Sequence, residues 1–175
     1  MLASAQADLN LNPSKGEYLL DGMKFEHLVF QDGLKTVSYA PPKGWTFSGS
    51  ADRFLLYPPG KSTVEASITK TILAQPYSLD EARTKKLTET ALASAPAGST
   101  SVALVAQEKN AFMLGGNESL LITLSYTFYG EPWKRSVMFL NRGKEQLRFQ
   151  ISSREVDFNE VEGAFKRSHL TWQNL

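Results

Sequence analysis

The chain has 175 residues, of which 42% are hydrophobic and 21% are charged, as in a typical soluble globular protein. Its 19 Lys and Arg nearly balance its 18 Asp and Glu, so no net positive charge favours binding to nucleic acid. Zero Cys excludes disulfides, thiol nucleophiles and Cys-ligated metals, and two His leave little for a histidine metal site. We expect no cofactor, no metal site and no nucleic-acid partner.

The first eight residues are rich in Ala and Ser. The spacing of Ala3, Ala5 and Ala7 fits the Ala-x-Ala pattern that signal peptidase cuts. We interpret the segment as the tail of a signal peptide, which predicts an exported protein, periplasmic or extracellular; the alternative is an ordinary flexible terminus. We therefore divide the chain into a flexible N-terminal remnant or lead-in, 1–16, and a single domain, 17–175.

The first half of the chain is predicted to form β-strands. Asp21-Gly22 and Asp32-Gly33 are dipeptides typical of tight hairpin turns, and Pro41-Pro42 ends the strand that follows them. Polar and apolar residues alternate over 64–72, which indicates a half-buried strand. The predicted strands span residues 23–30, 34–40, 54–57 and 64–72.

Two helices are predicted from capping-box patterns. Ser78 followed by Glu81 predicts a helix over 79–94, and Asp157 followed by Glu160 predicts the start of the last helix. Phe158, Val161, Phe165 and Trp172 would share one face of that helix. Between the helices, strands are predicted at 102–108, 111–114, 118–128, 133–141 and 145–152. No run of about 18 apolar residues occurs, so no membrane-spanning segment is expected.

Register in the last three strands is predicted from the pairing that brings apolar residues together. This pairing gives three rows: Ile122/Phe139/Leu147, Leu124/Val137/Phe149 and Tyr126/Arg135/Ile151. The opposite face would be polar and wet, with Thr123, Ser125, Thr127, Lys134, Ser136, Arg148 and Gln150. The expected fold is therefore α+β, an antiparallel sheet that is wet on one face and covered by helices on the other.

Arg135 is the one charged residue on the predicted apolar face, at the open end of the sheet. Its expected neighbours are Tyr126, Phe128 and Trp133. One interpretation is structural, with the Arg stem covering apolar surface and the guanidinium reaching solvent or stacking on a ring. The other is a shallow binding cleft with an anion-binding Arg and aromatic walls. We take these four residues as the candidate binding residues.

No pattern of catalytic residues is convincing. Gly60 to Thr63 resembles the end of a phosphate-binding loop, but the preceding Gly is missing and a strand follows. Ser67 and Lys70 have the spacing of serine–lysine acylases, yet on a strand they point to opposite faces. We interpret His27 and His169 as structural, so no residue is predicted to be catalytic.

The chain resembles the PsbP-like family in two segments. One is the Tyr-Ala-Pro-Pro-Lys-Gly-Trp run at 39–45, and the other runs from Asp157 through Phe165 to Trp172. The resemblance covers residues 18–173. It implies an α/β/α sandwich, as in the photosystem II protein PsbP, a Ran-binding nuclear import factor and small exported bacterial proteins. It also implies a binding or assembly role without catalysis, and no functional residue is carried over from it.

The function expected from these observations is that of a non-catalytic exported module that binds a protein or an envelope component. An alternative is a carrier for a small anion or lipid, held in a cleft between sheet and helix. A hydrolase is a third alternative, and it would need a Ser or an acid to converge with His27 or His169.

Overall fold

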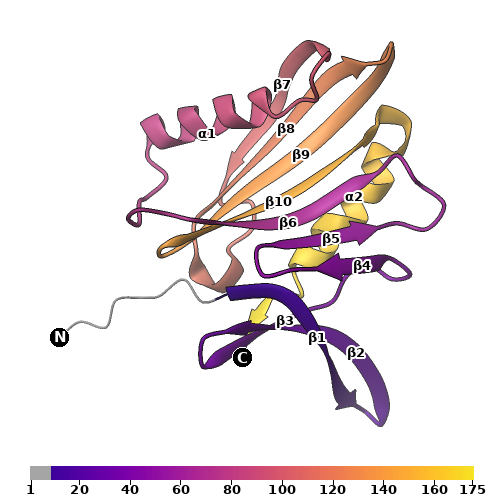
Figure 1. Cartoon of the computed structure of the whole chain (residues 1–175), viewed down its shortest axis with the longest axis vertical. Helices are drawn as coiled ribbons and strands as arrows, with labels where there is room; N and C mark the ends of the chain where they lie inside the picture. The colour runs from indigo at the N-terminus through magenta and orange to yellow at the C-terminus, as the bar shows by residue number, and fades with distance from the viewer. Residues whose placement is uncertain (1–8) are drawn as a thin grey trace.

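The computed structural model describes residues 9–175 as two antiparallel β-sheets and two α-helices (Figure 1). The signal-peptide interpretation concerns residues 1–8, which lie outside the described part. Residues 9–16, which we assigned to the N-terminal lead-in, form the first part of strand β1. Leu9 and Leu11 of this strand are fully buried, so the folded domain begins earlier than residue 17.

Seven strands form the larger sheet in the order β4-β5-β6-β10-β9-β8-β7, and four form the smaller sheet in the order β1-β2-β3-β11. The strands of the larger sheet are β4 (Thr46–Gly49), β5 (Arg53–Tyr57), β6 (Glu65–Ile72), β7 (Thr100–Lys109), β8 (Ser119–Phe128), β9 (Glu131–Arg142) and β10 (Glu145–Arg154). Those of the smaller sheet are β1 (Leu9–Leu20), β2 (Met23–Asp32), β3 (Lys35–Tyr39) and β11 (Gln173–Asn174). The helices are α1 (Glu81–Ala93) and α2 (Glu155–His169).

The predicted strand at 111–114 does not form. A short 3-10 turn, Leu114–Gly116, takes the chain from β7 to β8 instead. Gly115 and Gly116 have φ angles of +61° and +76°, which belong to the left-handed region and interrupt an extended strand.

The β8–β9 hairpin has a different register from the predicted one. Phe128 pairs with Glu131 rather than with Trp133, because the turn is only Tyr129-Gly130, with both residues at positive φ. The shift is two residues, so each side chain keeps its predicted face. Pro132 is tolerated because the β10 pairing of β9 ends at Trp133, which leaves Pro132 without a ladder partner on that side.

The β9–β10 hairpin is shifted by one residue, which overturns the three predicted rows. Arg142 pairs with Glu145 around a two-residue turn, so Phe149 pairs with Met138 rather than Val137. Leu147, Phe149 and Ile151 therefore lie on the opposite face from Phe139. The face that we expected to be wet is buried around these residues, and Arg148 and Gln150 share the Arg135 face.

Strand β9 is consequently buried on both faces. Met138 and Leu140 pack in one core cluster with Val161 and Phe165 of α2. Val137 and Phe139 pack in a second cluster with Leu87 and Ala91 of α1. Because successive side chains of a strand alternate, the two helices cover opposite faces of the larger sheet. The prediction that one face is wet was wrong for the centre of β9.

Both helices start differently from the predicted capping boxes. Helix α1 is capped by Asp80, whose carboxylate accepts a hydrogen bond of 2.7 Å from the Arg83 backbone N–H. Helix α2 begins at Glu155, and Asp157 and Glu160 form ion pairs with Lys61 at 2.6 and 3.2 Å. Trp172 lies beyond the end of α2, but its ring still packs in the core against Phe30 and Phe149.

The smaller sheet covers the α2 side of the molecule with one of its faces. Leu28, Phe30, Val37 and Tyr39 point into the core, and the Tyr39 hydroxyl bonds Ser168 Oγ at 2.7 Å. The far end of the β1–β2 hairpin projects beyond the rest of the molecule (Figure 1). The other face of this sheet is covered by no helix of residues 9–175.

Candidate functional site

Arg135 is buried at the C-terminal end of α1. Only 5% of its surface is exposed, and it lies opposite Leu124 and Ser152 rather than opposite Tyr126. Its Nη1 donates to the backbone carbonyl of Ser94, the C-cap of α1, and to Ser94 Oγ at 3.2 Å. A cation at this position is favourable because the carbonyl end of a helix is electronegative. Arg135 thus ties β9 to α1.

Of the three predicted aromatic neighbours, Tyr126 lies beside Arg135, and Trp133 and Phe128 are connected to Tyr126 through ring contacts. The Arg135 guanidinium lies 5.8 Å from the centre of the Tyr126 ring, and Trp133 stacks on Tyr126 at 6.4 Å. Phe128 meets Trp133 edge to face at 6.1 Å. Burial raises the pKa of Tyr126, and the charge of Arg135 partly offsets this.

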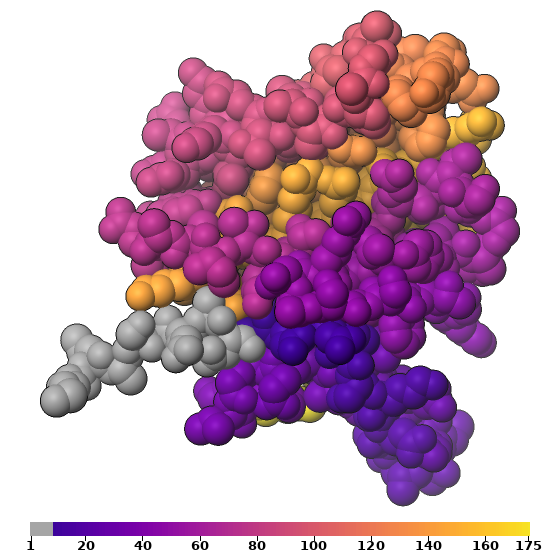
Figure 2. Space-filling view, viewed as in Figure 1, coloured from indigo at the N-terminus to yellow at the C-terminus, as the bar shows by residue number. Residues whose placement is uncertain are grey.

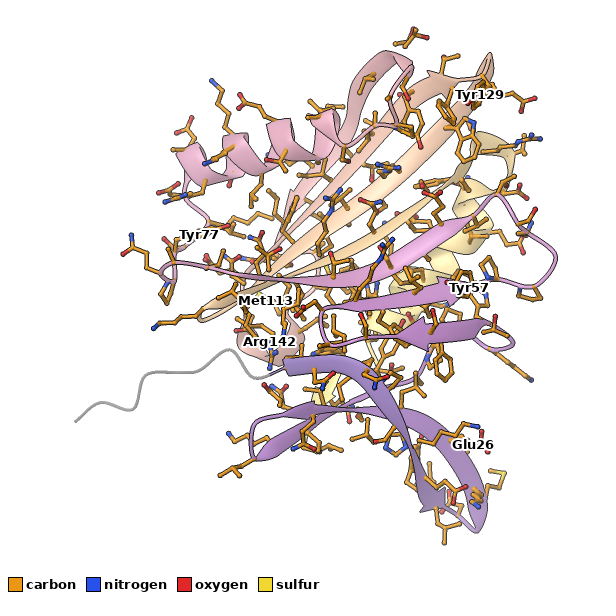
Figure 3. All side chains as sticks on the ribbon, viewed as in Figure 1. Glu26, Tyr57, Tyr77, Met113, Tyr129 and Arg142 are labelled. Carbon is orange, nitrogen blue, oxygen red and sulfur yellow. The ribbon has the colours of Figure 1, made fainter. Side chains whose placement is uncertain are left out.

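Tyr129, at the tip of the β8–β9 hairpin, is exposed at the opposite end of the molecule from Glu26 (Figure 3). The binding role of the four residues stays a prediction.

A second candidate is the outer face of the smaller sheet. The register places Gly16, Tyr18 and Leu20 of β1 directly opposite His27, Phe25 and Met23 of β2. Val29 pairs with Ser38 of β3, and Ser38 pairs with Gln173 of β11. We call this set the outer face: Ser14, Gly16, Tyr18, Leu20, Met23, Phe25, His27, Val29, Gln31, Thr36, Ser38 and Gln173. It contains no Lys, Arg, Asp or Glu.

The outer face is apolar and exposed at its hairpin end, around Tyr18, Leu20 and Met23. Leu20 is 55% exposed, and Tyr18 and Met23 are similarly open to solvent. The Tyr18 ring stacks on Phe25 with centroids 5.3 Å apart and lies 5.5 Å from His27. A contiguous exposed apolar surface of this kind on a folded domain typically marks an interaction site.

A cavity of about 460 Å³ opens beside this face. Tyr18, His27 and Ser38 line it from the sheet, and Leu170 and Leu175 line it from the C-terminal segment. Glycine at position 16 leaves room for the His27 ring, because a Cβ there would lie only 2.7 Å from His27 Nε2. The Nδ1 atom of His27 is buried without a hydrogen-bond partner among the described residues.

The opposite face of the projecting hairpin carries equal numbers of basic and acidic residues. It presents Lys15, Glu17, Lys24 and Glu26, and Lys24 pairs with Glu17 at 2.7 Å. The sequence contained the signal for this division, because charged residues alternate with uncharged ones on both sides of Asp21-Gly22. The signal was missed because residues 9–16 were not recognised as a strand.

His169, by contrast, is an internal residue. It is 2% exposed, and the rings of Phe149 and Phe165 meet it edge to face at 4.7 and 4.6 Å. Burial lowers its pKa from 6.5 to about 3, with a smaller effect from the charge of Lys166. The imidazole is therefore neutral at physiological pH.

No helix within residues 9–175 is long and apolar enough to cross a membrane. No protein-family model matches the chain, and no curated protein matches its sequence. Solved structures do match its fold. LpqN, involved in cell envelope biogenesis of Mycobacterium tuberculosis, aligns with a TM-score of 0.55 at 10% identity, covering 93% of this chain and 91% of LpqN. Cyanobacterial PsbP from Synechocystis sp. PCC 6803 aligns with a TM-score of 0.51 at 10% identity, covering 93% and 92%.

The fold thus belongs to the α+β class, built from antiparallel sheets and two helices. Within that class it is PsbP-like, as the resemblance at residues 39–45 and 157–172 implied. At 10% identity, the likeness concerns the fold and transfers no site.

Proposed function

We propose that this chain is a non-catalytic, exported binding module that recognises an apolar surface of a partner protein through its outer face. The single observation behind the proposal is that the outer face carries no charged residue. Tyr18, Leu20 and Met23 are exposed on it, and a cavity adjoins it. LpqN, which has a similar fold and is involved in cell envelope biogenesis, supports a module of this kind outside the cytoplasm.

A protein partner suits the charges of the hairpin better than a lipid surface does. Structures that bind in the membrane interface usually flank their apolar face with Lys and Arg, which attract anionic lipids. The opposite face of the hairpin presents two bases and two acids, Lys15, Lys24, Glu17 and Glu26, whose charges cancel. The hairpin therefore offers anionic lipids no excess of positive charge, which favours a protein partner.

Leu19 and Leu20 offer a matched pair for the test. They are adjacent and chemically identical, and they are 75% and 55% exposed on opposite faces of β1. A photo-crosslinking amino acid is placed at position 20 or at position 19 in the source organism. The protein captured from position 20 is identified, purified and titrated against the wild-type chain, Leu20→Lys and Leu19→Lys.

We expect capture from position 20 and not from position 19. Leu20→Lys should weaken the measured affinity at least about tenfold, which corresponds to about 1.4 kcal/mol, whereas Leu19→Lys should leave it nearly unchanged. Equal capture from both positions would contradict the proposal. So would Leu20-dependent binding to lipid vesicles with no protein partner. Fractionation of cells that express the full precursor tests the export separately.

A further inference from the structure

The α1-facing side of the larger sheet holds a row of unusual composition. Arg53 of β5 pairs with Thr69 of β6, and Thr69 pairs with Arg148 of β10. Residues directly opposite one another share a face, and neighbouring strands lie about 4.8 Å apart. The two arginines therefore flank the Thr69 hydroxyl from strands separated by about 10 Å. In the next row, Ser67 pairs with Gln150.

This part of the sheet is open to solvent. Helix α1 lies over β7 and β8, and Figure 2 shows atoms of β10 between α1 and the β5–β6 strands. A cavity of about 290 Å³ is lined by Arg53, Ser67 and Gln150, with the apolar Leu55 and the Tyr57 ring at its side (Figure 3). Glu65 also lines this cavity, whereas Thr69 and Arg148 belong to the adjoining row and not to the cavity lining. We call the cavity and the row together the trough: Arg53, Leu55, Tyr57, Glu65, Ser67, Thr69, Arg148 and Gln150.

The positive charge of the trough is not neutralised from within the protein. Neither Arg53 nor Arg148 forms an ion pair with a carboxylate of residues 9–175, and nor does the adjacent Arg135. The acid facing this side is Glu65, exposed opposite Ser152. Folded proteins rarely hold partly buried charges without a counter-charge, because the desolvation is then uncompensated.

Two guanidiniums retain unused donors here. Arg148 donates from Nη2 to Gln150 Oε1, but its Nε is buried and has no acceptor in the described structure. The Nε of Arg135, a residue that is only 5% exposed, likewise has no acceptor among the described residues. Burial, together with the charge of Arg135, lowers the pKa of Arg148 below its usual range. An external anion in the trough would supply an acceptor for the Arg148 guanidinium, whereas the buried Arg135 contributes positive charge only.

We infer that the trough is a binding site for a phosphate group, with Arg148 and Arg53 as its main contacts. A phosphate dianion matches the charge of the two guanidiniums, and its oxygens accept from the Ser67 and Thr69 hydroxyls and the Gln150 amide. Arg135 adds positive potential from beneath α1. The apolar Leu55 and Tyr57 ring accommodate the organic part of a phosphate ester. This site is separate from the outer face, and neither depends on the other.

The test is a titration with orthophosphate at constant ionic strength, with chloride as the reference anion. The ¹H–¹⁵N signals of the arginine Nε–H groups report each guanidinium, and thermal unfolding gives an independent measure by mass action. Variants are Arg148→Met, Arg53→Met and Arg148→Lys, with Arg167→Met on α2 as the matched control. A parallel arm compares vesicles containing phosphatidic acid with vesicles of phosphatidylcholine alone.

We expect a saturable shift of the Arg148 Nε–H signal with orthophosphate. Arg148→Met and Arg53→Met should each weaken binding about tenfold or more, Arg148→Lys less, and Arg167→Met not at all. Arg53 is exposed, so Arg53→Met answers the question even if Arg148→Met misfolds. Arg148-dependent binding to phosphatidic acid alone would identify a lipid headgroup as the source of the phosphate. A response no larger than that to chloride, or one unchanged in both Met variants, would overturn the inference.

Discussion

Strands β9 and β2 occupy different environments, one in each sheet. β9 contributes Val137 and Phe139 to one core cluster and Met138 and Leu140 to the other, so it has no solvent face at its centre. β2 buries Leu28 and Phe30 but presents Phe25, His27 and Val29 on the outer face. A continuous apolar run therefore marks the strand covered by two helices, and alternation marks the sheet with one face free.

The largest expected effects come from single truncations in these two strands. Met138→Ala and Phe139→Ala should each lower the free energy of unfolding by about 2–5 kcal/mol, because both of these adjacent residues are buried. Phe30→Ala should cost about as much, whereas Phe25→Ala should cost less than about 1 kcal/mol. Urea unfolding measures all four. A cost for Phe25→Ala as large as that for Phe30→Ala would show that the outer face is packed in solution.

The stability of the fold should depend on pH through His169. Burial in the core between β10 and α2 keeps its imidazole neutral. Its pKa is about 3 in the folded chain and about 6.5 when unfolded, so below pH 6.5 only the unfolded state takes up the proton. The stabilisation is present above pH 6.5 and is lost as the pH falls towards 3, by up to about 1.4 kcal/mol per pH unit.

His169→Phe removes this titration and keeps the ring among Phe149 and Phe165. From pH 7 to pH 5 the wild type should lose about 2 kcal/mol more stability than the variant does. Carboxylates such as Glu145, whose pKa is raised by burial, titrate in both proteins and cancel in the comparison. Parallel losses in the two proteins would mean that His169 is not held neutral.

Much of the fold was predictable because its signals are local. The Asp21-Gly22 turn, the alternation over 64–72 and the three long C-terminal strands were located to within two residues of their true ends. The second sheet was not predictable in the same way. It depends on β1 pairing with β2 over residues 9–20, and the Pro13 and Gly16 positions conceal that strand in a propensity analysis.

The candidate site was less predictable because it depends on register. A one-residue error at Gly143 moved Phe149 and Ile151 to the Arg135 face and moved Arg148 and Gln150 away from it. The correct register brings Arg148 and Arg135 to one side of the sheet, which no local pattern reveals. The apolar run Val137 to Leu140 was the overlooked evidence that β9 is covered twice.

A smaller effect is expected from Arg135→Met, which separates the structural role of Arg135 from the predicted binding role. The variant keeps the apolar stem but removes the donors to Ser94 and Ser152, so it should cost about 1–3 kcal/mol. Urea unfolding gives the cost. Hydrogen exchange should show faster opening at the C-terminal end of α1 than at its start. Unchanged exchange there would mean that Arg135 does not anchor the helix to β9.

The smallest expected difference concerns the start of α1, the helix that gives β9 its second cover. Asp80 accepts the Arg83 backbone N–H at 2.7 Å, whereas no described helix bond involves the Ser78 side chain. Asp80→Ala should therefore cost about 1 kcal/mol, and Ser78→Ala should stay within about 0.5 kcal/mol of the wild type. A larger cost for Ser78→Ala would mean that the predicted Ser78 capping box forms after all. The expected result would confirm that the helix starts beyond Leu79. The side chain of Leu79 is buried and its backbone N–H donates to Glu118, so the segment before the helix is held against the sheet.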